Sequence, residues 1–161
     1  MTRSLPHLAN DSWEALLTAH AVLMKRFAAA PIWDEVSIRE YDVLYTLSKH
    51  AAPIRLGELN RNVLLSQPAL SRLVERLVDR GLVERAPDPA DGRGVRLTLT
   101  EAGREQQRRT GRRHADDVTR EVGAALTETE MRQLEAITRK LAGRTRPHST
   151  ETDPIPTLRR Q

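Results

Sequence analysis

Between residues 66 and 81 the apolar side chains recur at the 3.6-residue period of an α-helix. Ser66 is a natural N-cap, and Pro68 is tolerated in the first turn, where its missing N–H would have no helical partner. Gly81 can end the helix because glycine readily takes a left-handed conformation. We therefore expect an amphipathic helix whose apolar face is formed by Leu70, Leu73, Val74 and Leu77.

A two-stranded β-ribbon is expected directly after this helix. Residues 82–85 and 95–99 are β-prone and roughly alternate between apolar and polar, and residues 87–94 between them are rich in turn formers. A ribbon of this size is marginally stable alone and needs a helix beneath it. The order of helix, strand, turn and strand is typical of a DNA-reading helix followed by a β-wing.

A short extended segment and a shorter helix are expected upstream, within residues 54–63. The apolar face of this shorter helix is formed by Leu56, Leu59 and Val63. Leu64 and Leu65 then lead into the Ser66 cap, which makes a helix–turn–helix with a tight connection.

In a helix–turn–helix the first residues of the second helix reach base edges in the major groove of DNA. Gln pairs well with adenine and Arg with guanine, because each can make two hydrogen bonds to one base edge. The alternative is a solvated polar face on an ordinary core helix, and the wing favours the DNA-reading interpretation. The candidate reading residues are Ser66, Gln67, Pro68, Ser71 and Arg72.

Residues 54–103 resemble the winged helix–turn–helix of MarR-type bacterial transcription regulators. The matching stretches are Ser71–Leu77, Arg80–Arg85 and Asp91–Gly103, which include an Asp-x-Arg wing, a Leu-Thr pair and a following glycine. One departure is Asn60, where many relatives have a small alanine between the two helices.

By this resemblance Arg93 would enter the minor groove and Asp91 would help to fix the wing. The resemblance also implies a homodimer in which the N- and C-terminal helices of two copies interlock. The fold class is then mainly α with a small β-wing, and the winged core spans about residues 37–100.

The N-terminal flank is expected to be helical. Asn10 or Asp11 can cap a helix that Pro31 stops, and Ser37 and Glu40 make a capping box for a second helix. The apolar stripe of the first helix is Trp13, Leu16, Leu17, His20, Leu23, Met24 and Phe27; that of the second is Ile38, Tyr41, Leu44, Tyr45 and Leu47.

The C-terminal flank is also expected to be helical. Thr100 caps a long polar helix, which we expect Gly103 and Gly111 to interrupt. Another capping box, at residues 127–130, opens a further helix. The apolar positions of these helices are Val118, Val122 and Leu126, and then Met131, Leu134, Ile137 and Leu141.

We expect one domain over residues 10–142 and a disordered tail over 143–161, where apolar content is low. A small winged core leaves the apolar stripes of helices 10–31 and 101–142 without enough surface to bury against. Pairing with a second copy solves this, and a two-fold dimer would present two recognition helices to a pseudo-palindromic operator. A monomer with its end helices packed on the core is the alternative.

Other arginines are candidates for phosphate contacts. Residues 104–113 are rich in arginine and either touch flanking phosphates or form a solvated face with Glu101–Arg104 and Glu105–Arg109 pairs. The single candidates near the motif are Arg39, Arg55, Arg76 and Arg96.

Composition narrows the classes of function. The chain has 161 residues and no cysteine, which excludes disulfides and thiol-based sensing by this chain. Only 3% of residues are aromatic and 30% are charged, as suits a helix-rich protein, and the net charge is +4. No apolar run approaches the ~20 residues that span a bilayer, so we expect a cytoplasmic protein.

Motifs of an enzyme are absent: the sequence has no Gly-rich phosphate loop, no G-x-S-x-G and no H-E-x-x-H. The histidines lack metal-ligand spacing, and we expect no metal and no cofactor. The resemblance implies a repressor that a small aromatic or phenolic effector releases; an architectural DNA-binding protein without a specific operator is the alternative. Candidate pocket residues, each also explicable as packing, are His20, Met24, Phe27, Trp33, Tyr41, Tyr45 and His114.

Overall fold

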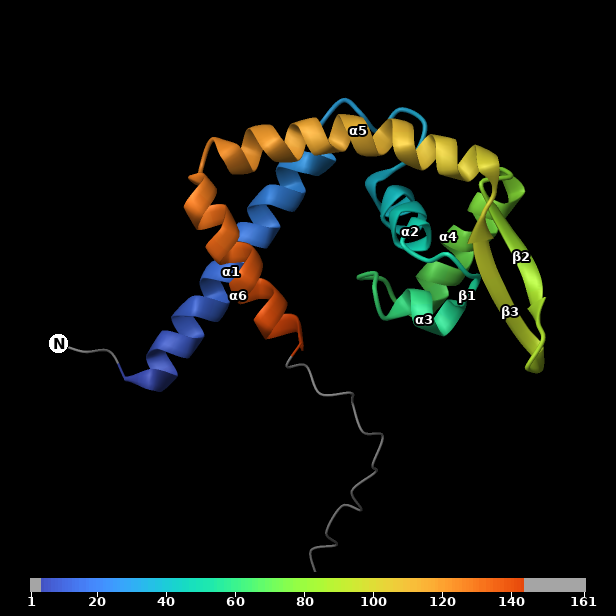
Figure 1. Ribbon diagram of the computed structural model, residues 1–161, viewed down its shortest axis with the longest axis horizontal. Coiled ribbons are helices and arrows are strands. Elements are labelled where there is room, and N and C mark those ends of the chain that lie inside the picture. The colour runs from blue at the N-terminus through green and yellow to red at the C-terminus, as the bar shows by residue number, and fades with distance from the viewer. Residues whose placement is uncertain (1–3, 144–161) are drawn as a thin grey trace, which may run out of the picture. The chain divides into compact units, whose positions relative to one another are not determined.

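The computed structural model describes residues 4–143, and the expected tail lies outside them except for Gly143. The chain divides into two compact units, with the boundary between Glu121 and Val122. The elements are α1 (Leu5–Ala28), α2 (Ile38–Ser48), β1 (Ile54–Arg55), α3 (Leu56–Asn60), α4 (Gln67–Asp79), β2 (Val83–Asp88), β3 (Asp91–Leu99), α5 (Glu101–Gly123) and α6 (Glu128–Gly143) (Figure 1). The fold class is mainly α with a small antiparallel sheet, as the sequence predicts.

The core of the first unit lies among α2, α3, α4 and the sheet. The predicted apolar face of α4 is confirmed, since all four of its residues are buried. Burying one aliphatic side chain stabilises a fold by roughly 1.5–3 kcal/mol, so this face fixes the helix firmly to the core. The residues that meet it include Val36, Val43, Leu44, Leu47, Leu59, Val83, Leu97 and Leu99.

The sheet has three strands rather than the two that we expected. Its order is β1-β3-β2, and Ile54 of β1 pairs with Leu97 of β3. β1 is only two residues long, so its own sequence carries no strand period. The wing strands are also longer than predicted, because residues 87–88 and 91–94 belong to strands and only Pro89 and Ala90 form the turn. A register shift between Pro87 and Asp88 marks a bulge at the end of β2.

Helix α1 begins earlier than we expected. Its N-cap is Ser4, with a proline in the first turn, so the prediction of a cap at Asn10 or Asp11 is wrong. The helix ends at Ala28, before Pro31. Asn10 and Asp11 lie inside α1, because a proline in the first helical turn needs no N–H partner and an early start is favourable.

The capping box of α2 is confirmed. The backbone N–H of Glu40 donates to Ser37 Oγ, and the Glu40 carboxylate accepts from the Ser37 backbone N–H at 2.8 Å. Tyr41, Leu44 and Leu47 are buried as predicted. Tyr45, however, lies largely exposed, and Ile38 is only half-buried.

Helix α5 runs unbroken through Gly103 and Gly111, so the predicted interruptions are wrong. Thr100 caps it as predicted, because its hydroxyl accepts from the Gly103 N–H at 2.9 Å and donates to the Gly81 carbonyl at 2.6 Å. These two bonds tie the start of α5 to the end of α4.

The second unit contains α6. Its predicted capping box is confirmed: the Thr127 N–H donates to Glu130 Oε2 at 2.8 Å, and the Glu130 N–H donates to Thr127 Oγ1 at 3.4 Å. No residue of α6 is buried, and Leu134, Ile137 and Leu141 are exposed. Over residues 4–143, no helix is both long and apolar enough to cross a membrane.

Candidate nucleic-acid interface

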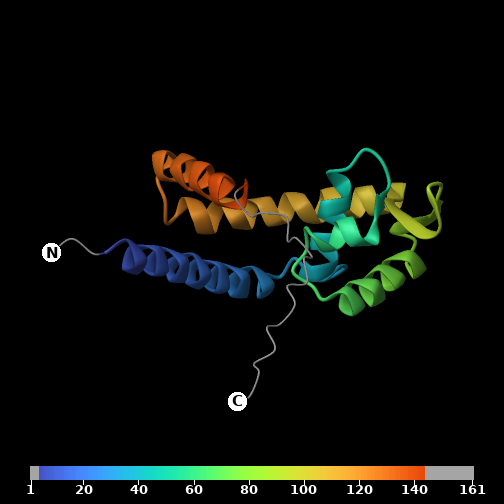
Figure 2. The same cartoon turned by 90° about the horizontal axis from the view of Figure 1, so that it is seen from below.

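Helix α4 lies at the outside of the first unit, where the face opposite its buried side chains meets solvent (Figure 2). Gln67, Pro68 and Arg72 are exposed there, and Ser71 is half-buried. Ser66 is the N-cap residue as predicted, but its side chain accepts no capping hydrogen bond. The Ser66 hydroxyl is therefore not engaged by its own helix.

The end of α4 is built as predicted. Gly81 has a φ of +67°, the left-handed conformation that favours glycine. Its N–H donates to the Val78 carbonyl at 2.8 Å, and the Leu82 N–H donates to the Leu77 carbonyl at 2.9 Å. The chain thus turns at once from the recognition helix into β2.

A shallow groove of about 190 Å³ separates α4 from the wing. Ser71 Oγ donates to Glu75 at 3.5 Å, and Glu75 lies 3.9 Å from Arg85 of β2. The sequence analysis placed Ser71 here but missed Glu75 and Arg85, whose pairing depends on the fold.

The wing is anchored by Asp88, which the sequence analysis did not single out. Its carboxylate is fully buried and accepts from the Ala90 N–H at 3.0 Å. Arg55 Nε donates to the same carboxylate, and Arg96 Nε lies 3.1 Å from it. Two predicted phosphate contacts, Arg55 and Arg96, therefore meet at one carboxylate. The sequence Asp88-Pro89-Ala90 is a turn-forming pattern that could have indicated this role.

The pKa of Asp88 is lowered to about 2. The backbone N–H of Ala90 is the largest cause, and the hydrogen bond from Arg55 is the next. Asp88 is therefore ionised at neutral pH, and its negative charge attracts the guanidinium groups of both arginines. Asp91 and Arg93 both lie in β3, and the Asp91 carboxylate lies beside Gly94; the roles that we expected of the two residues stay predictions.

The remaining predicted arginines are placed differently. Arg76 is exposed on α4 and donates to the Arg72 carbonyl at 3.4 Å. Arg39 lies on α2 and lines a cavity beside α1. Arg80, which was not among the predicted contacts, lies at the end of α4, donates to the Glu35 carbonyl at 2.6 Å and pairs with Glu40 at 3.3 Å.

The arginine-rich run of α5 is largely paired with carboxylates of this chain. The expected Glu101–Arg104 pair forms at 3.8 Å, but the expected Glu105–Arg109 pair does not. Glu105 pairs instead with Arg108 at 2.9 Å, and Arg109 reaches Glu35 in the segment before α2. Arg113 likewise pairs with Asp34 at 3.0 Å and donates to the Pro31 carbonyl at 2.8 Å. These bridges hold the α1–α2 connection against α5.

Five of the seven predicted pocket residues lie together in an aromatic cluster. The His114 ring centroid is 5.1 Å from that of Phe27 and 5.5 Å from those of Trp33 and Tyr41. Tyr45 stacks on Tyr41 at 5.8 Å. The Trp33 indole N–H donates to the Phe27 carbonyl at 2.6 Å, so the cluster is packed within the first unit.

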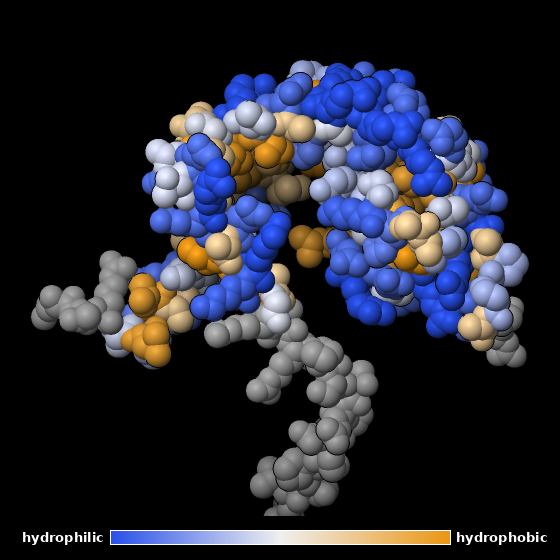
Figure 3. Space-filling model, viewed as in Figure 1, coloured by the Kyte–Doolittle hydropathy of each residue, from blue (hydrophilic) through white to orange (hydrophobic). Residues whose placement is uncertain are grey.

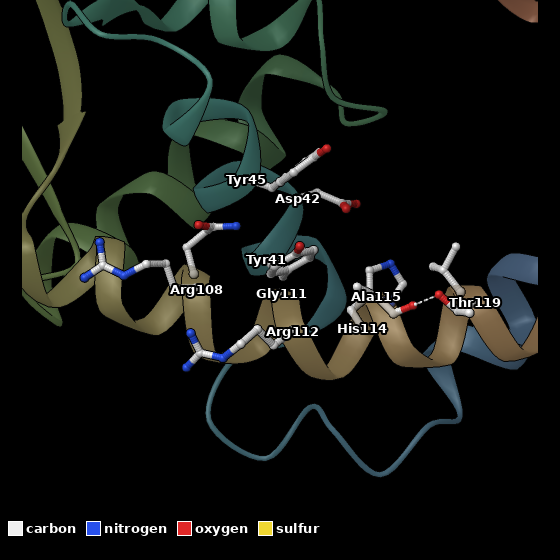
Figure 4. A pocket seen from close by; sticks show the side chains of 11 residues that line it. Tyr41, Asp42, Tyr45, Arg108, Gly111, Arg112, His114, Ala115 and Thr119 are labelled. Carbon is white, nitrogen blue, oxygen red and sulfur yellow. Dashed lines mark hydrogen bonds between the residues drawn. The ribbon is translucent and has the colours of Figure 1, made fainter. Parts of the chain in front are cut away.

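A cavity of about 680 Å³ adjoins this cluster between α2 and α5 (Figure 4). Tyr41, Asp42 and Tyr45 line it from α2, and His114 and Arg112 from α5. Burial raises the pKa of Asp42, and the charge of His114 acts in the opposite direction.

The other two predicted pocket residues, His20 and Met24, line a second cavity of about 680 Å³, which shares Asp42 and Tyr45 with the first. Lys25 and Arg39 also line this cavity, and Lys49 places its Nζ 3.9 Å from the centre of the Tyr45 ring. Over residues 4–143, no group of three or more His, Asp or Glu side chains is arranged to hold a metal ion.

Known proteins are similar to this chain in sequence and in fold. A profile of the MarR family matches residues 35–94. The multiple antibiotic resistance protein MarR of Salmonella typhimurium is 30% identical over 66% of this chain and 74% of its own length. The crystal structure of Sco3205, a MarR family transcriptional regulator from Streptomyces coelicolor, in complex with DNA superposes with a TM-score of 0.74 at 26% identity, covering 94% of this chain and 96% of that one.

A second solved structure is the PcaV transcriptional regulator from Streptomyces coelicolor in complex with its natural ligand. It has a TM-score of 0.63 at 25% identity and covers 91% of this chain and 99% of that one.

A recognition helix fixed by one buried face, a helix–turn–helix before it and an anchored wing after it define a winged-helix DNA-binding protein. With the sequence and structural matches above, the class becomes specific. The chain belongs to the MarR family and is a DNA-binding transcriptional regulator; the family is one of regulators, not of enzymes.

Proposed function

We propose that this protein is a homodimeric repressor that binds a pseudo-palindromic operator through α4 and the wing. The observation that carries this proposal is the amphipathic character of α4. Its apolar face is buried, while Gln67, Arg72 and Arg76 on the opposite side are exposed to solvent. An operator-bound dimer that overlaps a promoter would block it, so repression is the outcome that we favour.

The proposed contacts fall into two classes. Gln67, Ser71 and Arg72, with Ser66 and Pro68 at the start of α4, would read base edges in the major groove. Arg93 would enter the minor groove from the wing, beside Asp91. The proposed phosphate contacts are Arg39, Arg55, Arg76 and Arg96.

The exposed apolar side chains of the end helices support a homodimer. Helix α1 is 24 residues long, yet Phe27 is its only buried residue among those described. The large apolar side chains exposed on it are Leu5, Leu8, Trp13, Leu17 and Val22. Figure 3 shows orange, apolar surface at the N-terminal end of α1. Several large exposed apolar side chains on one helix indicate an interaction site, and a second copy of the chain is the partner that we propose.

We further propose that a small aromatic effector releases the protein from DNA. The aromatic cluster and the adjoining cavity between α2 and α5 support this proposal, as does the ligand complex of PcaV. The effector would act by binding one spacing of the two recognition helices better than the other, because only differential affinity shifts an equilibrium.

Binding to DNA at one fixed salt concentration tests the proposed function. We expect the protein to bind a fragment from the region upstream of its own gene at least ~10³-fold more tightly than a scrambled fragment of equal length. Equal affinity for both fragments would favour an architectural DNA-binding protein and would rule out a specific operator.

A further inference from the structure

The base of the wing contains a fully buried carboxylate between two arginines. Asp88 stands at the bulge that ends β2, and its side chain is 0% exposed. One of its oxygens, Oδ1, accepts from the Ala90 N–H at 3.0 Å and so fixes the two-residue turn of the wing. Both oxygens are engaged, because Oδ2 accepts from Arg55 Nε.

The two arginines would repel each other without this carboxylate. Arg55 of β1 and Arg96 of β3 are direct partners across the antiparallel ladder, a position in which like charges destabilise a sheet. Asp88 lies between their guanidinium groups and offsets one of the two positive charges.

Asp88 contacts both arginines through Nε. The hydrogen bond orients the Arg55 guanidinium group, whereas Arg96 Nε, 3.1 Å from Asp88 Oδ1, is held by charge without a hydrogen bond. The side chains of Arg55 and Arg96 are 52% and 33% exposed, so both reach solvent from a fixed base.

We propose that Asp88 is a positioning residue for specific DNA binding, which holds Arg55 and Arg96 in the geometry that meets operator phosphates. The same carboxylate limits non-specific binding, because it cancels one of two positive charges at the wing base. Non-specific affinity depends on the number of cations that reach phosphates, whereas specific affinity also depends on where they are held. This inference rests on the proposed operator binding.

The substitution Asp88→Asn distinguishes the positioning of the two arginines from the structural role of the side chain in the turn. The amide keeps an oxygen that can accept from Ala90, and it has nearly the same volume, but it carries no charge. We expect binding to the upstream fragment to weaken about tenfold. Binding to the scrambled fragment should strengthen, and its slope of log K against log salt should become steeper by the amount of about one additional phosphate contact. Asp116→Asn is the matched control, since it removes one exposed carboxylate of α5 and should leave the ratio of the two affinities unchanged.

A second variant is needed if Asp88→Asn fails to fold, which circular dichroism would show. Arg55→Lys keeps the charge and leaves Asp88 with a cation, but it removes the Nε contact that orients the guanidinium group. We expect Arg55→Lys to weaken specific binding several-fold with non-specific binding unchanged.

The inference is overturned if folded Asp88→Asn keeps the wild-type ratio of the two affinities. Where only Arg55→Lys is folded, an unchanged ratio overturns it. A wild-type protein that binds both fragments equally refutes the proposed function and this inference with it, whereas a discriminating wild type with an equally discriminating variant refutes the inference alone.

Discussion

The α-carbon of Gly103 and the carbonyl group of Leu82 approach so closely that no side chain fits between them. A Cβ on residue 103 would lie 1.9 Å from the Leu82 oxygen and 2.9 Å from its carbonyl carbon. The Leu82 oxygen also accepts from the Thr100 N–H at 3.2 Å. The first turn of α5 therefore packs directly against the backbone between α4 and β2.

Gly103→Ala is expected to destabilise the fold by about 3 kcal/mol or more, because the backbone of Leu82 or of the first turn of α5 must shift to admit the methyl group. Gly123→Ala is the matched control: nothing lies within 4 Å of its added Cβ, and we expect a change within about 0.5 kcal/mol. Urea unfolding at one protein concentration measures both. Equal stability of the two variants would show that the close approach does not constrain this glycine.

The lowered pKa of Asp88 predicts a specific acid sensitivity. Because its folded-state pKa of about 2 lies below the ordinary value of 3.8, the carboxylate stabilises the fold above the unfolded-state pKa. That stabilisation is lost as pH falls from about 5 through about 2. We expect Asp88→Asn to lose less free energy of unfolding than wild type over this interval. Parallel acid limbs in urea unfolding would contradict the assignment.

Arg93→Ala is expected to weaken operator binding and to reduce the slope of log K against log salt by about one contact, because a groove contact with a charged side chain is lost. Fluorescence anisotropy over a salt titration measures both quantities. An unchanged dissociation constant at every salt concentration would remove Arg93 from the interface.

Gln67→Ala and Arg72→Ala are expected to relax base preference at one operator position each, by about 1–3 kcal/mol. Arg108→Ala is a control, since Arg108 lies on α5 and pairs with Glu101 and Glu105. Binding to a panel of single-base operator variants is the measurement. A uniform loss across the panel would make Gln67 or Arg72 a backbone contact instead.

Trp13→Glu is expected to weaken dimerisation by about 30-fold or more, because it places a charge on the exposed apolar face of α1. Glu14→Gln, at a neighbouring exposed position, should leave the dimer intact. Sedimentation velocity over a range of concentrations reports the change. A wild-type protein that stays monomeric at every concentration would refute the proposed dimer.

The parts of the fold with strong local patterns could be predicted from the sequence. The buried face of α4, the left-handed Gly81 and the capping boxes at Ser37 and Thr127 each depend on residues a few positions apart. Spacing and side-chain chemistry determine such features directly.

Features that depend on distant partners were missed or wrong. Two residues of β1 become a strand only because β3 lies beside them, and Arg109 prefers Glu35 to Glu105 only because the α1–α2 connection returns to α5. Gly103 resembled a helix breaker, although close packing against Leu82 requires it.

In the candidate site, too, some residues could be predicted from local sequence patterns and others depend on distant partners. The exposed reading residues of α4 follow from helical periodicity, since residues opposite a buried face must meet solvent or a partner. The role of Asp88 could not be predicted in this way, because Asp88, Arg55 and Arg96 lie on three different strands that only the fold brings together. The wing motif favoured Asp91, whose role in fixing the wing stays a prediction, whereas Asp88 at the junction of those strands was not singled out.

The central claim is that α4 and the wing of a two-fold dimer read a particular DNA sequence. Selection of bound fragments from a randomised DNA library by the wild-type protein, at physiological salt, tests it most directly. We predict enrichment of an inverted repeat whose half-sites lie about one helical turn, roughly 10 base pairs, apart. Enrichment of no sequence over the starting library would contradict the account.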